Sequence, residues 1–62
     1  MQALTFFADE TKTLYTLQPS YNLYRIEIEE IPQASVAVYY LAPQRIIELL
    51  AKAKARPMLV AR

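Results

Sequence analysis

The chain has 62 residues, of which 55% are hydrophobic, and a formal net charge of +1. Because it contains no cysteine, histidine or glycine, disulfide bonds, the usual zinc sites and the glycine-rich loops that bind nucleotide phosphates are excluded. Residues 1–62 are long enough for a single small domain, and self-association is the remaining way to stabilise so small a core.

The first two predicted elements are strands joined in a hairpin. Residues 2–8 are rich in β-forming side chains and end in a polar turn at 9–11. A second strand is expected at 12–18, after which Pro19 and Ser20 suit the central positions of a type I turn. Since glycine is absent, positive φ angles should fall to Asn or Asp or be avoided.

The third strand, residues 21–29, has the clearest pattern in the chain. Apolar and charged residues alternate along it, as a strand with one buried and one solvated face requires. The side chains expected to be buried are Tyr24, Ile26 and Ile28. Pro32 then interrupts the pairing, because proline has no N–H to donate to a neighbouring strand.

The fourth strand, residues 35–41, is apolar on both faces. One small core cannot cover both faces, so one of them is expected to meet a second copy of the chain. We predict that Tyr40 lies inside, as Tyr24 does, and that Tyr39 lies at the interface. The full set of residues predicted to mediate self-association is Ala37, Tyr39 and Leu41.

A helix is predicted from Pro43 to about Arg56. Proline suits the first helical position, and the apolar residues that follow share one stripe of the helix. Pro57 ends the helix, and residues 58–61 suit a short final strand beside the first or third strand. The predicted fold is therefore α+β: an antiparallel meander of four to five strands, one C-terminal amphipathic helix packed across it, and a short final strand.

Charge is unevenly distributed along the chain. Residues 43–62 carry five cations and one acid, a net +4, whereas residues 1–42 sum to −3. Separated charge selects the partners that approach a protein, but cations near the end of a helix also complement its dipole without any partner. The candidate residues for docking an anion or an acidic partner are Arg45, Lys52, Arg56 and Arg62.

Other residue types do not form a recognisable catalytic or metal site. Five tyrosines lie in or beside strands, where aromatic rings can stack on nucleic-acid bases, but the acids of the same strands would repel phosphate. Glu27 and Glu29 share one side of a strand without a calcium-binding loop or an adjacent nucleophile. We expect no metal, no cofactor and no enzymatic activity, since a chain this short has little room for a catalytic pocket.

The leading hypothesis is a non-enzymatic protein-interaction or regulatory module that forms a homodimer through apolar sheet surface. The alternative is a nucleic-acid-binding protein that uses the basic C-terminal helix, and the same helix could instead dock onto an acidic protein. The N-terminal residues do not resemble a targeting segment, and no apolar run reaches the ~18 residues of a membrane span. A cytoplasmic location without a membrane partner is therefore expected.

Overall fold

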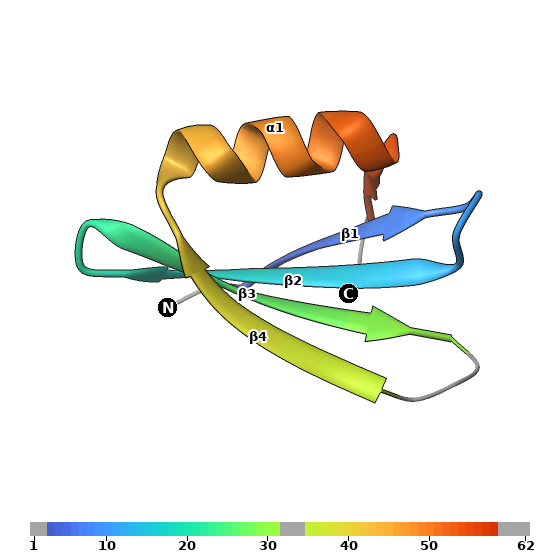
Figure 1. Cartoon of the computed structure of the whole chain (residues 1–62), viewed down its shortest axis with the longest axis horizontal. Coiled ribbons are helices and arrows are strands. Elements are labelled where there is room, and N and C mark those ends of the chain that lie inside the picture. Colours follow the sequence, from blue (N-terminus) through green and yellow to red (C-terminus); the bar gives the residue numbers. More distant parts are fainter. Residues whose placement is uncertain (1–2, 32–34, 59–62) are drawn as a thin grey trace.

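The computed structural model describes residues 3–31 and 35–58, which form a five-stranded sheet with one helix across one face (Figure 1). The order of strands in the sheet is β4-β3-β2-β1-β5, and each neighbouring pair is antiparallel. The predicted α+β fold is confirmed. The elements are β1 (Leu4–Ala8), β2 (Thr13–Ser20), β3 (Leu23–Glu30), β4 (Ser35–Leu41), α1 (Pro43–Ala53) and β5 (Arg56–Pro57).

The core lies between α1 and the middle of the sheet. The helix places Ile46 above β2 and β3, where Leu17 and Ile26 are direct neighbours across the two strands. Tyr24 is half-buried against this core. The prediction that Tyr40 lies inside is wrong, because its side chain is 55% exposed. The buried apolar residues are Ala8, Tyr15, Leu17, Ile26 and Ile46.

The turn between β2 and β3 differs from the predicted one. Ser20 pairs with Leu23, so the turn consists of Tyr21 and Asn22, and Pro19 lies within β2 opposite Tyr24. Along an antiparallel ladder, hydrogen-bonded pairs alternate with non-hydrogen-bonded pairs. Pro19 and Tyr24 form a non-hydrogen-bonded pair. Its missing N–H therefore removes no bond between β2 and β3, which is why proline is tolerated inside this strand.

Positive φ angles fall on residues other than Asn and Asp, contrary to the prediction. Among the described residues they occur at Lys12 (55°), Tyr21 (56°) and Lys54 (56°), each in a connection between elements. A side chain in the left-handed region costs roughly 1 kcal/mol, a cost that glycine would avoid. The glycine-free sequence thus forms its tight connections with local backbone strain.

Helix α1 begins as predicted and ends earlier. Pro43 is the first helical residue, but the helix stops at Ala53, so the predicted end at Arg56 is wrong. The Lys54 N–H donates to the Ala51 carbonyl (3.1 Å), and the Ala55 N–H donates to the Leu50 carbonyl (3.0 Å). These two bonds form a Schellman motif, which requires a left-handed residue directly after the helix. Lys54 supplies that conformation where glycine is usual.

The final strand, β5, pairs with β1. Its two residues lie opposite Phe6 and Phe7, and the Met58 N–H continues the contact by donating to the Thr5 carbonyl (2.8 Å). The strand therefore lies beside the first strand, one of the two predicted neighbours, and begins before the predicted range. Residues 59–61 of that range lie outside the described part of the chain. No helix in the described part has the length and apolarity needed to cross a membrane.

Candidate interaction surface

The two faces of the sheet differ in what covers them. Figure 1 shows α1 lying along one face; none of the helices and strands formed by residues 3–31 and 35–58 covers the other, which we call the open face. Tyr39 lies opposite the buried Ile26 and therefore on the helix face. Because side chains alternate along a strand, Val38 and Tyr40 lie on the open face. The residues that β3 and β4 place on the open face are Leu23, Arg25, Glu27, Glu29, Val36, Val38 and Tyr40.

β4 is an edge strand with apolar side chains exposed on both faces. Among the described strands it pairs only with β3, and none of its seven residues is charged. Long, uncharged, apolar edges are unusual, because they can pair with a strand of another molecule. The exposed fractions are 56% for Val36, 43% for Val38 and 55% for Tyr40 on the open face, and 50% for Tyr39 on the helix face.

The opposite edge of the sheet has features that discourage pairing. Within the part of the chain that the structure describes, β5 consists of Arg56 and Pro57. A short strand, a charge and a proline are the means by which proteins normally protect an edge. Since β4 has none of them, the two edges of the same sheet differ sharply in their capacity to accept another strand.

The unpaired backbone groups of β4 can be identified from the register. The Ile31 N–H donates to the Lys12 carbonyl (2.9 Å), so odd-numbered residues of β3 direct their backbone groups toward β2 and even-numbered ones toward β4. The β4 residues opposite the even-numbered ones therefore bond to β3. The remaining residues have their N–H and C=O groups at the free edge, and these are Val36, Val38 and Tyr40.

The charged residues next to β4 interact with one another. The Arg25 Nη1 atom lies 2.6 Å from the Glu27 carboxylate and donates to the Gln18 side-chain oxygen at 3.4 Å. The hydrogen bond to Glu27 is the main reason that the pKa of the Arg25 guanidinium is raised above its usual value. Charge on the open face is thus concentrated on β3 and partly compensated there, while β4 stays uncharged.

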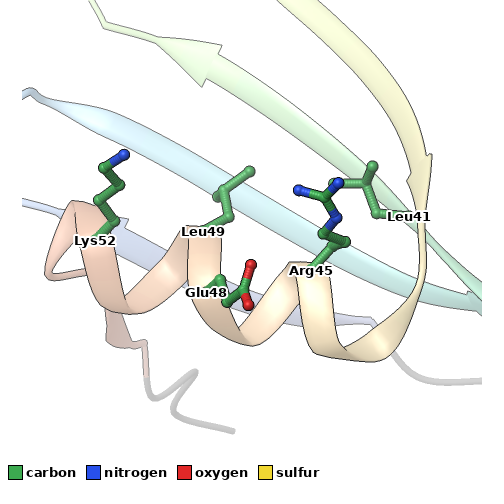
Figure 2. Close-up of a pocket in the computed structure, with 5 residues that line it drawn as sticks. All are labelled: Leu41, Arg45, Glu48, Leu49 and Lys52. Carbon is green, nitrogen blue, oxygen red and sulfur yellow. The ribbon is translucent and has the colours of Figure 1, made fainter.

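Two of the predicted docking cations lie along one groove on the helix. Figure 2 shows Arg45 and Lys52 on the same side of α1, with Glu48 between them and Leu41 and Leu49 nearby. The groove has a volume of about 510 Å³. Its single acid reduces the positive potential that an anion would meet.

Of the other two predicted docking cations, Arg56 lies apart from this groove. Arg56 lies in β5 opposite Phe7 and therefore on the open face of the sheet. Arg45 belongs to α1, which lies on the other face of the sheet. Arg62 lies outside the described residues. The structure thus brings Arg45 and Lys52 together and separates Arg56 from them. Among the described residues, no cluster of acids is arranged to hold a metal ion.

The predicted self-association residues share the helix face of β4. Tyr39 is half-exposed, Ala37 is half-buried, and Leu41 is half-buried against the core of its own chain. The exposed set on the open face was missed by the sequence prediction. The available signal was the connection between β4 and α1, because Ala42 alone separates Leu41 from the helix and so fixes Leu41 on the helix face.

Comparisons with protein-family models, curated proteins and solved structures found no match to this chain. The physical properties of β4 therefore provide the basis for a functional proposal.

Proposed function

We propose that this protein is a small, non-enzymatic interaction module that self-associates as a homodimer through the apolar surface of β4. The observation that carries the proposal is a seven-residue edge strand without any charge and with four apolar side chains about half-exposed. An edge of this kind is the usual template for pairing with another strand.

The gain from covering β4 is large relative to the stability of so small a domain. Burying one aliphatic side chain completely contributes about 1.5–3 kcal/mol. Complete covering of the four half-exposed side chains of β4 would therefore contribute at most about 4 kcal/mol. The free energy of unfolding of small domains is about 5 kcal/mol at the low end of its usual range. Dimerisation would therefore supply a major part of the total stability.

The same features argue for assembly that is insensitive to salt. β4 contributes no charge, so screening by ions should leave the association nearly unchanged. Nucleic-acid binding through Arg45 and Lys52, the alternative function, would weaken steeply as the salt concentration rises. We place the module in the cytoplasm, a reducing compartment with which a cysteine-free composition is compatible.

Sedimentation velocity of the unmodified chain and of two matched variants tests the proposal. The unmodified protein should be a dimer at concentrations of about 10 μM or higher, which corresponds to a micromolar or tighter Kd. Val38→Lys adds a charge to the free edge and should give a folded monomer. Ile47→Lys adds the same charge at an exposed aliphatic side chain of α1 and should leave the dimer intact.

Two results would overturn the proposed function. One is an unmodified protein that stays monomeric throughout this concentration range. The other is a Val38→Lys variant that still forms a dimer as tight as that of the unmodified chain. Circular dichroism of each variant establishes that a change in mass does not arise from unfolding.

A further inference from the structure

We infer that the strand on the free edge of β4 is β4 of a second copy, antiparallel and in a register centred on Val38. This inference rests on the proposed function and specifies the geometry of the assembly. The result would be one continuous antiparallel sheet through both copies, with a two-fold axis between the two Val38 residues and the two open faces on the same side.

The directions of the backbone groups restrict the possible registers. Within Ser35–Leu41, only Val36, Val38 and Tyr40 present N–H and C=O groups at the free edge, so the hydrogen-bonded pairs that β4 makes with a second copy form within this set. Symmetric pairing centred on Val38 places Val36 of each copy opposite Tyr40 of the other. This register uses all three residues and pairs the whole strand, whereas any shifted register leaves one end of β4 unpaired.

The side chains are complementary in the same register. On the open face, a β-branched residue meets an aromatic one at each Val36–Tyr40 pair, a combination that stabilises antiparallel sheets. On the helix face, the small Ala37 lies opposite the large Tyr39 of the second copy. A shift by one residue pair toward Leu41 would instead place the two Tyr39 rings opposite each other.

A groove on the helix face has a position suited to the Tyr39 ring of the second copy. It has a volume of about 370 Å³, and along β4 it is lined by Ala37 and by Tyr39 of the same chain. Its other lining residues are Ile28, Glu30, Ser35 and Val36. Tyr39 itself is half-exposed on this face. Pairing centred on Val38 brings the ring of each Tyr39 beside Ala37 of the other copy, so each copy supplies both a protruding ring and a groove.

Charge also favours a second copy as the occupant. A two-fold axis brings each side chain near its own equivalent or that of a close neighbour, and like charges in such positions are destabilising. The neighbouring strand β3 carries Arg25, Glu27, Glu29 and Glu30, whereas β4 carries no charge at all. A contact made by a single strand from each copy is expected to be smaller than a standard interface of about 800 Å² per partner, so the expected Kd is roughly micromolar.

Disulfide cross-linking tests the register, because the chain has no cysteine of its own. Ala37→Cys and Tyr39→Cys are prepared separately, mixed and oxidised. In the proposed register, residues 37 and 39 of different copies form a non-hydrogen-bonded pair with Cα atoms about 4.5 Å apart, within the range for a disulfide. The two Ala37 Cα atoms would be roughly 8 Å apart, too far for one.

The mixed disulfide should therefore dominate over either homodimeric disulfide, as measured by mass spectrometry of the oxidised mixture. Val38→Cys serves as a second probe that leaves Tyr39 in place. It should cross-link to itself, because the two Val38 Cα atoms lie about 5.5 Å apart in this register. Tyr21→Cys, in the exposed turn between β2 and β3, should remain largely uncross-linked.

The outcomes separate the register from the proposed function. One contradicting result is a protein that is a dimer by sedimentation while Ala37→Cys or Tyr39→Cys forms mainly homodimeric disulfides. Another is such a dimer in which Val38→Cys does not cross-link. Either result overturns the register but not self-association. A monomer before any substitution overturns both. Sedimentation of the reduced variants shows whether each cysteine variant still associates.

Discussion

Glu27 and Val38 lie directly opposite each other across β3 and β4, with both side chains on the open face. The two strands differ in chemistry at this boundary. β3 places three charged side chains on the open face, and β4 places only uncharged ones there. The sheet thus passes from a solvated strand to an apolar edge within one strand spacing.

Removing the N–H of Val38 should dissociate the dimer without unfolding the domain. This group points to the free edge, so Val38→Pro loses no bond to β3 but loses a bond to the second copy. We expect the Kd from sedimentation equilibrium to rise by at least about tenfold, the equivalent of 1.4 kcal/mol. Tyr39→Pro is the comparison variant, because the Tyr39 N–H points to β3. This variant should lose the pairing of β4 with β3. Equal dimerisation of Val38→Pro and the unmodified chain would contradict the prediction.

Glycine at position 54 should stabilise the protein. Lys54 has φ 56° and ψ 39° in the Schellman motif that ends α1, a conformation that glycine adopts without the clash of a side chain. Lys54→Gly should raise the free energy of unfolding by about 1 kcal/mol in urea denaturation at fixed protein concentration. Lys52→Gly, within the last helical turn, should lower it by a similar amount. A lower free energy of unfolding for Lys54→Gly would contradict this prediction. It would show that the Lys54 side chain stabilises the fold by more than its left-handed backbone conformation destabilises it.

Stability should fall at alkaline pH through Tyr15. Burial, and to a smaller extent the Glu30 carboxylate, raises the pKa of the Tyr15 phenol above its usual value of 10.0. The neutral form is favoured in the folded state. Its contribution to stability is therefore fully present below pH 10.0 and is lost as the pH rises through the higher pKa of the folded protein.

Tyr15→Phe should accordingly lose less stability above pH 10.0 than the unmodified chain does. Thermal unfolding measured across this range, at equal ionic strength, provides the comparison. Tyr21→Phe is the matched control, because it removes a hydroxyl group from a tyrosine that is fully exposed. Identical alkaline profiles for Tyr15→Phe and the unmodified protein would count against this role of Tyr15.

Truncation of Ile26 should unfold much of the population. Ile26 is completely buried at the centre of the core, between Leu17 on β2 and Tyr39 on β4. Replacing such a side chain by alanine typically costs about 2–5 kcal/mol, comparable with the whole stability of a small domain. Loss of the circular dichroism signal of Ile26→Ala at room temperature is the expected result. Retention of native stability would place the core elsewhere.

Much of the fold could be predicted from local patterns. The alternation in β3 and the position of Pro43 are direct consequences of burial and backbone geometry, and both identify the correct elements. The turn after β2 was predicted wrongly because proline signals a turn locally. The register of β2 against β3 instead places Pro19 in a non-hydrogen-bonded pair, where its missing N–H has no effect.

The errors at the candidate site have a similar origin. β4 has apolar residues at every position after Ser35, so its sequence contains no alternation that distinguishes the two faces. The short connection to α1 determines which side chains of β4 lie on which face. It fixes Leu41 on the helix face, which leaves Tyr40 exposed. Similarly, the end of α1 depends on the left-handed conformation of Lys54, which a lysine does not signal in a sequence.

Amide hydrogen exchange at Val38, measured by NMR, tests the pairing of β4 most directly. In an isolated chain this N–H points to solvent at the free edge, and in the proposed dimer it is bonded to the second copy. Its exchange should slow by at least about tenfold as the protein concentration rises through the Kd, while the Tyr21 amide changes little. A Val38 amide that exchanges as fast as that of Tyr21 in a sample shown to be dimeric would contradict pairing at this edge.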